Sequence, residues 1–336
     1  MVSGHRNSIN QRMDMKPIRF VTALSMVIVL AGFTGLNAAS INSNAGTSAY
    51  PFLKVDVGAR PVGMGGAFTG LANDEAALYY NPAGIVGLEG THYMLEYHNY
   101  FVDMQSGFLA MTHQLGENKA YGAYINYLNY GDMTETDNFG NVLGTFGGGD
   151  WLLGLTFAMR PHRQYQFGAT AKFIYEKIHD YSSAGVAFDL GARYTSDRGR
   201  YSAGVMVQNL GLQLSTLGEG DKEKLPLTFR AGGAARFRGI PIQFAGDVIL
   251  PIDNDVDFAV GGEYYEFDPL FLRLGWNSFG SNYRAGGSDD NWSGLSVGIG
   301  FNIKDLGFVK NAQLSYSYSP AADLGEIHRI TLTGGR

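Results

Sequence analysis

The stretch QYQFGATAKFIYEKI, residues 164–178, decides the fold because its apolar and polar side chains alternate one by one. Side chains in a β-strand point alternately to opposite faces, so this stretch makes one apolar, aromatic face and one face of polar residues and glycine. The apolar face holds Tyr165, Phe167, Ala169, Ala171, Phe173 and Tyr175. Such a two-faced strand is typical of a wall that separates lipid from a polar interior.

The same alternation recurs along residues 91–336. We count about fourteen segments of roughly ten residues, the length that a tilted transmembrane strand requires. A soluble β-sandwich is the alternative, but its strands average about 5 to 6 residues. We therefore predict an all-β fold, a transmembrane antiparallel β-barrel of about 14 strands. The predicted centres are Tyr93, Phe108, Tyr124, Leu155, Ala169, Asp189, Val205, Ala231, Gly246, Val260, Leu274, Gly298, Leu314 and Ile330.

The connections between these segments predict an orientation. Long connections at residues 131–149, 211–225 and 278–291 follow odd-numbered strands, whereas those after even-numbered strands are short. Outer-membrane barrels have short periplasmic turns and longer external loops. We therefore expect a protein of the outer membrane whose N-terminus is periplasmic.

Composition excludes several classes of function. Charged residues are 17% of the chain, against about 25% in ordinary soluble domains. The formal charge of -6 is spread without a basic face, so nucleic acid is not an expected partner. The chain has no cysteine, which removes disulfides, thiolate metal sites and cysteine nucleophiles.

The first residues read as a targeting segment. Basic residues precede an apolar run over residues 20–36, and small residues follow it at positions 37–40. This order is that of a secretory signal peptide, which we assign to residues 1–39. A single membrane-anchoring helix is the alternative, although the run is marginal for a span of about 20 residues.

Three short motifs superficially suggest chemistry. The glycines of residues 63–66 lack the βαβ unit that a dinucleotide site needs, and residues 294–298 match G-x-S-x-G in mid-strand rather than at a strand-to-helix turn. Residues 253–257 lack the glycine and glutamate of a calcium loop, and the histidines are scattered. We predict no enzymatic activity, no catalytic residue, no cofactor and no metal.

The stretch GARPVGMGGAFTGLANDEAALYYNPAGI, residues 58–85, precedes the first strand. A barrel of about fourteen strands is too wide for its own side chains to fill, so something must occupy the lumen. Glycines in this stretch allow tight turns and close approach to the wall. Asn81 can cap a helical turn that has Pro82 in its first position. We therefore predict an N-terminal hatch at residues 40–90, with the barrel at residues 91–336.

This stretch, followed by two-faced strands to the C-terminus, resembles the PorV/PorQ family of outer-membrane proteins, which is itself similar to FadL-type transporters of hydrophobic compounds. The shared pattern covers residues 58–60, 64–69, 74 and 79–84. The resemblance implies a fourteen-stranded barrel whose hatch motif lies in the lumen. The residues of this motif are Gly58, Arg60, Gly63, Gly65, Gly66, Asp74, Asn81, Pro82, Ala83 and Gly84.

The resemblance also implies two functions. PorV-like proteins serve type IX secretion, where they bind secreted proteins through C-terminal secretion domains and pass them to a surface sortase. FadL-like proteins let fatty acids or aromatic compounds through a gated hatch. The leading hypothesis is an accessory, cargo-binding component of type IX secretion, and the alternative is a channel for hydrophobic small molecules. Outer-membrane lipid is an expected partner in both.

Overall fold

The computed structural model describes residues 44–336, apart from residues 101–102, 279–291, 308 and 322–323. The chain divides into two compact units, Met1–Asn37 and Ala38–Arg336, and all described residues belong to the second. The predicted signal peptide, residues 1–39, lies outside the described residues. It stays a prediction, as does the boundary between a hatch and a barrel.

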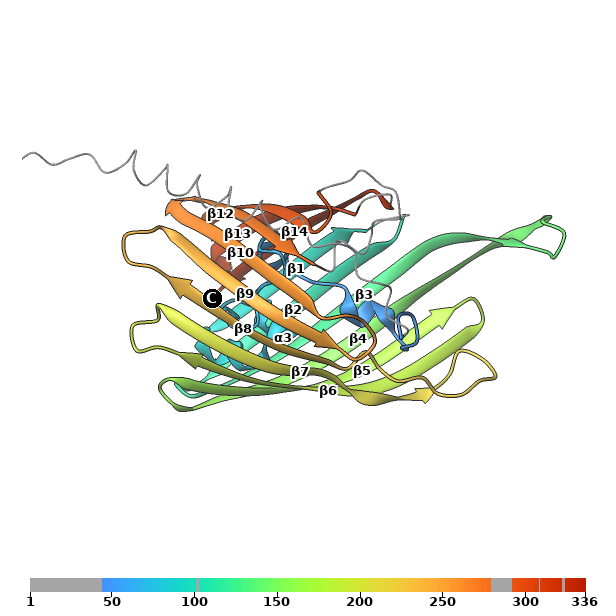
Figure 1. Ribbon diagram of the computed structural model, residues 1–336, viewed down its shortest axis with the longest axis horizontal. Coiled ribbons are helices and arrows are strands. Elements are labelled where there is room, and N and C mark those ends of the chain that lie inside the picture. The colour runs from blue at the N-terminus through green and yellow to red at the C-terminus, as the bar shows by residue number, and fades with distance from the viewer. Residues whose placement is uncertain (1–43, 101–102, 279–291, 308, 322–323) are drawn as a thin grey trace, which may run out of the picture. The chain divides into compact units, whose positions relative to one another are not determined.

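Fourteen strands of the described chain close into one antiparallel barrel (Figure 1). Each strand pairs with its neighbours in sequence, and β1 pairs with β14 to close the ring. The predicted fold is confirmed, and every predicted centre lies inside a strand. The strands are β1 (Thr91–Asn99), β2 (Gln105–Leu115), β3 (Lys119–Thr136), β4 (Val142–His162), β5 (Tyr165–Ile178), β6 (Tyr181–Thr195), β7 (Tyr201–Ser215), β8 (Thr228–Arg236), β9 (Ile242–Pro251), β10 (Asp257–Phe267), β11 (Leu270–Asn277), β12 (Leu295–Leu306), β13 (Val309–Pro320) and β14 (Glu326–Gly335).

The alternation in the sequence becomes the two faces of this wall. On β5, Phe167 and Phe173 are 42% and 50% exposed on the outside, whereas Thr170 and Lys172 are 1% and 4% exposed on the inside. Large apolar side chains are exposed in the same manner on the other strands. A sandwich would bury this face against a second sheet, whereas a barrel that crosses a bilayer presents it to lipid.

The predicted long loop at residues 131–149 is wrong, because β3 and β4 continue through most of it. A compact turn joins them, in which the Asp137 carboxylate accepts hydrogen bonds from the backbone nitrogens of Phe139 and Asn141 at 2.8 and 2.9 Å. With the turn held this way, the strand ladder extends almost to it. The glycines and polar residues here resemble a loop in sequence but pair as an extended hairpin.

The other two long connections differ in what the structure describes. β7 continues to Ser215 and β8 begins at Thr228, so that connection lies further along the chain than residues 211–225. Most of the predicted loop at residues 278–291 lies outside the described part of the chain.

Residues 44–90, hereafter the N-terminal segment, precede the wall and contain four short helical elements. These are η1 (Pro51–Lys54), α2 (Ala59–Gly63), α3 (Ala77–Tyr80) and η2 (Pro82–Gly87). No helix of the described ranges has the length and apolar character needed to cross a membrane.

The N-terminal segment lies within the ring of strands. Its backbone and side chains form hydrogen bonds with β1, β6, β7, β8, β9, β10, β12 and β14, which is feasible only from inside the barrel. Its own apolar residues, among them Phe68, Leu78 and Tyr80, are fully buried and cluster with Phe108 of β2 and Tyr124 of β3. The segment therefore supplies much of the apolar core inside the barrel, together with inward-facing apolar residues of the wall such as Leu152 and Ile174.

Candidate functional site

The candidate site is the contact between the N-terminal segment and the inner wall. Glycines on the wall allow the closest approaches, because a Cβ at each of them would clash with or press against the segment. They stand on β5, β6, β7, β8, β10, β11 and β12, and β6 carries two of them. These wall glycines are Gly168, Gly185, Gly191, Gly204, Gly261, Gly275 and Gly298, together with Gly232 of β8, whose carbonyl oxygen would lie 2.6 Å from a Cβ on Gly70.

Gly65 shows how tight this contact is. Its φ of +70° favours glycine, and a Cβ there would lie 2.6 Å from the backbone nitrogen and oxygen of Trp276. From the other side, a Cβ on Gly275 would lie 1.9 Å from the Gly65 nitrogen. Two backbones meet without side chains between them, so neither position can accept a larger residue without moving the segment.

Other glycines of the predicted motif meet the wall close by. Gly63 faces Gly298 of β12, where its Cβ would lie 3.0 Å from the Gly298 Cα. The backbone nitrogen of Gly58 donates to the buried carboxylate of Glu96 on β1. The Gly66 carbonyl oxygen accepts a hydrogen bond of 3.0 Å from Nη2 of Arg230 on β8. The structure thus brings these motif residues to one interface.

Arg60 forms the main ionic link between the segment and the wall. Its Nε and Nη2 donate to the two carboxylate oxygens of Glu263 on β10, both at 2.8 Å. Its Nη1 donates to Asp74 Oδ2 and Asn73 Oδ1, also at 2.8 Å each. Burial lowers the pKa of Arg60, but the carboxylates of Glu263 and Asp74 raise it by more than burial lowers it. The net shift of the pKa is upward, so the guanidinium stays charged. Arg273 of β11 also donates to Glu263, from Nε at 2.7 Å.

Asp74 and Glu75 connect this ionic link to the turn before α3. Asp74 Oδ1 accepts a hydrogen bond of 2.9 Å from the Ala76 nitrogen, so the carboxylate holds the turn as well as Arg60. Glu75 Oε1 lies 2.9 Å from Nδ1 of His92 on β1. Burial raises the pKa of Glu75, and the His92 contact opposes part of that rise.

The Asn-Pro-Ala-Gly element of residues 81–84 is fully buried. Asn81 caps η2 by accepting a hydrogen bond from the Ala83 nitrogen at 3.2 Å, and Pro82 follows in the first turn. Asn81 Nδ2 also donates to the carbonyl oxygens of Thr69 and of Ala192 on β6, at 3.0 and 3.1 Å. Gly84 packs against Ala72, whose carbonyl oxygen would lie 2.1 Å from a Cβ at that position. One side chain therefore joins two parts of the segment to the wall.

Asn81→Ala should loosen the N-terminal segment without opening the barrel wall. The change removes one acceptor and two donors from buried backbone groups, and each orphaned group costs about 1–3 kcal/mol. We expect faster amide hydrogen exchange at residues 66–90, measured by mass spectrometry, with unchanged protection of the strands. Asn118→Ala, in an exposed turn, is the matched control. Exchange in the Asn81 variant at the wild-type rate would contradict this role.

Charged groups on the inner wall hold the backbone of residues 66–71. The nitrogens of Phe68 and Thr69 donate to Asp247 Oδ2 of β9 at 3.0 and 2.8 Å. Arg193 of β6 donates to the carbonyl oxygens of Gly70 and Leu71 at 3.1 and 2.8 Å. Both of these inward-facing charged groups therefore bond to the segment.

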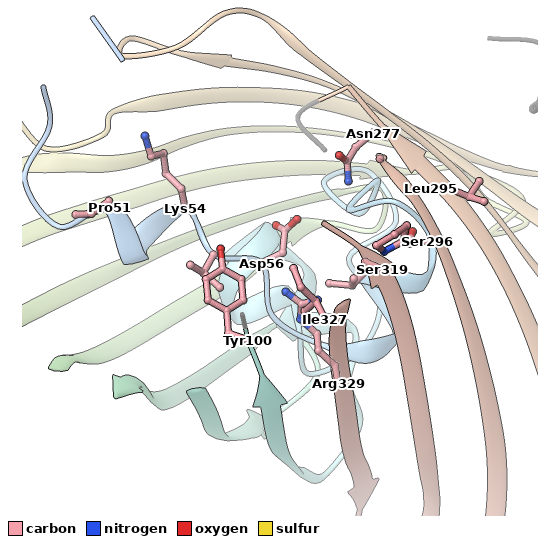
Figure 2. A pocket seen from close by; sticks show the side chains of 14 residues that line it. Pro51, Lys54, Asp56, Tyr100, Asn277, Leu295, Ser296, Ser319, Ile327 and Arg329 are labelled. Atoms are coloured by element: carbon pink, nitrogen blue, oxygen red, sulfur yellow. The ribbon is translucent and has the colours of Figure 1, made fainter. Parts of the chain in front are cut away.

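Among the cavities along the N-terminal segment, two lie toward opposite rims of the barrel. One, of about 540 Å³, opens at the rim that holds the C-terminus and is lined by Arg60, Glu75 and the strand ends near Arg336. The other, of about 260 Å³, lies toward the opposite rim between the start of the segment and β11 to β14 (Figure 2). Apolar residues and a few charged ones line this second cavity, hereafter the upper cavity.

Residues of the short motifs at 294–298 and 253–257 form structural contacts with the N-terminal segment. Ser296 is buried on β12, and its Oγ lies 3.2 Å from the Gly65 nitrogen, which donates to it. Asp253 forms an ion pair of 2.6 Å with Lys54 Nζ of the segment. Among the described residues, no group of three or more histidine, cysteine or acidic side chains is arranged to hold a metal ion.

The fold and the site define a class: a fourteen-stranded antiparallel barrel with an N-terminal segment folded inside it. Solved structures of similar fold include the toluene transporter TodX of Pseudomonas putida, at 13% identity over 82% of this chain and 96% of that chain, with a TM-score of 0.57. The toluene transporter TbuX of Ralstonia pickettii matches at 14% identity over 82% and 96%, with a TM-score of 0.54. A FadL homologue of Pseudomonas aeruginosa matches at 11% identity over 88% and 98%, with a TM-score of 0.51.

Sequence comparison adds no closer relative. No protein-family model matches the chain, and no curated protein does either. At the identities found, the solved structures establish the fold alone.

Proposed function

We propose that the protein is an outer-membrane channel for hydrophobic small molecules in which the N-terminal segment acts as the hatch. The observation that carries this proposal is a segment packed inside a lipid-facing barrel with a cavity toward each rim. The similar folds named as toluene transporters support the same class of cargo. No catalytic step is part of the proposal.

The proposed orientation puts the N-terminus in the periplasm. The barrel begins and ends at one rim, where Thr91 and Arg336 exchange backbone hydrogen bonds of 3.2 and 2.8 Å. The short connections after the even-numbered strands lie at this same rim, such as the two residues between β10 and β11. Short turns face the periplasm in outer-membrane barrels.

The test is uptake by intact cells, because toluene dissolves unaided in a pure phospholipid bilayer. Cells that lack their own hydrocarbon channels and express the protein should take up radiolabelled toluene faster than cells with an empty vector. Uptake of a hydrophilic disaccharide should stay at the control rate, since the segment fills the lumen. Toluene uptake no faster than in control cells, with the protein present in the outer membrane, would refute the channel.

A secretion accessory remains the second candidate. It rests on the motif of residues 58–84 and its resemblance to PorV/PorQ proteins. Co-purification from native membranes should then recover secreted proteins through their C-terminal domains, or a surface sortase. Recovery of neither, alongside measurable toluene uptake, would leave only the channel.

A further inference from the structure

We infer that Arg329 and Ser319 form a carboxylate-binding subsite in the upper cavity, which selects a monocarboxylate with a body of about one aromatic ring. This inference rests on the proposed channel function and deepens it. It begins with Arg329 on β14, which lines the upper cavity and is only 4% exposed. Figure 2 shows Arg329 and Asp56 among the side chains around this cavity.

The guanidinium of Arg329 forms no hydrogen bond or ion pair within the described part of the chain, although the buried carboxylate of Glu96 on β1 attracts it from a greater distance. Its Nε is buried without a hydrogen bond, and no described carboxylate lies within ion-pair distance. Other arginines buried in the lumen all have acceptors: Arg60 and Arg273 bind Glu263, while Arg193 and Arg230 bind backbone carbonyl oxygens. A buried guanidinium without a hydrogen-bonded acceptor is costly, so an anion bound at hydrogen-bond distance is the natural complement.

Further unpaired polar groups surround this guanidinium. Ser317 stands opposite Arg329 in the β13–β14 register, and Ser319 lines the cavity two residues further on. Both hydroxyl oxygens are buried without a hydrogen bond to any described residue, and so is Nε2 of His98, which stands opposite Arg329 on β1. Of the two serines only Ser319 lines the cavity, and its hydroxyl together with the planar guanidinium suits the two acceptor oxygens of a carboxylate.

The rest of the upper cavity limits the body of the ligand. Val55, Val62 and Ile327 give it apolar walls. Its volume of about 260 Å³ falls just below the range of roughly 300–1,000 Å³ that holds drug-sized ligands. A single ring therefore fits it better than a long alkyl chain.

Asp56 of the N-terminal segment adds specificity. Its carboxylate lines the same cavity and forms no hydrogen bond or ion pair with any described residue. A second carboxylate on the ligand would bring like charges together in a confined site. The subsite should therefore prefer benzoate to terephthalate, and benzoate to neutral toluene.

The test uses the full-length protein in lipid nanodiscs and equilibrium dialysis with radiolabelled benzoate, terephthalate and toluene. Wild type should bind benzoate most tightly. Arg329→Gln should weaken benzoate binding by about tenfold or more, the size expected for a charged hydrogen bond, and leave toluene binding unchanged. Asp56→Asn should bring terephthalate closer to benzoate. Arg198→Gln, in an exposed turn, is the matched control.

The variants also distinguish failure of the proposed subsite from failure of the proposed channel function. Should Arg329→Gln not fold, Ser319→Ala removes one donor and should still lower benzoate affinity by about threefold. Benzoate affinity that is unchanged in both Arg329→Gln and Ser319→Ala would overturn the subsite. Loss of benzoate affinity in Asp56→Asn, as expected for a zwitterionic ligand, would overturn it as well. If cells take up toluene but the protein in nanodiscs shows no preference for benzoate, the subsite is refuted and the channel function is retained. If cells take up no toluene but the protein still binds benzoate, the channel function is refuted and the subsite is retained.

Discussion

Arg60→Met should turn a closed barrel into one that opens frequently. The side chain of Arg60 is 14% exposed and pairs with Glu263, which is 4% exposed, so its loss leaves Asp74 of the segment without its cation and Glu263 of the wall with Arg273 alone. Breaking a buried pair on one side costs about 3–5 kcal/mol. Where that cost falls on the seated state alone, the balance between seated and displaced segment shifts by a hundredfold or more, at about 1.4 kcal/mol per tenfold.

Single-channel recording in planar bilayers measures this shift. Wild type should show rare openings, and Arg60→Met should show frequent ones of large conductance. Arg60→Lys keeps the charge but loses the two-pronged contact, so it should fall between them. Arg238→Met, at an exposed turn, should behave as wild type. Closed recordings from Arg60→Met would mean that the wall glycines and the remaining hydrogen bonds hold the segment without this ion pair.

The wall could be predicted from the sequence because lipid and lumen impose opposite demands on alternate residues. Residues 164–178 satisfy both demands at most positions, with Ile174 on the inner face as an exception, and they form β5 almost to the residue. The prediction failed at residues 131–149, where a hairpin extends without any need for an apolar face. Alternation reports what a strand faces, so it is silent where both faces are wet.

The site was predictable only on one of its two sides. The glycines of the N-terminal segment and the cap of Asn81 depend on local chain geometry, which a short stretch of sequence contains. Their partners do not, because Arg60 and Glu263 are 203 positions apart. Which residues of the wall face the segment depends on the stagger of the closed barrel. Glycines on the polar face of many strands were the available signal, since an inner wall that meets only water has no need of them.

Gly275→Val should displace the N-terminal segment more completely than the loss of Arg60. A Cβ here would lie 1.9 Å from the Gly65 nitrogen and 2.1 Å from the Met64 carbonyl carbon, and backbone atoms cannot turn aside as a side chain can. The strand itself should tolerate valine, which favours β structure. We therefore expect a folded barrel with a permanently open lumen, seen as steady large conductance and as disaccharide entry into expressing cells.

Gly246→Val is the matched control, because Gly246 lies on the outward face of β9 and its Cβ would have only ordinary contacts at 3.7 Å or more. The same substitution on the lipid side should leave the conductance closed. The double variant Arg60→Met with Gly275→Val should open no further than Gly275→Val alone, because a segment already displaced has no ion pair left to lose. Additive effects would mean that the two residues act on separate parts of the segment, and that it moves in pieces rather than as one body.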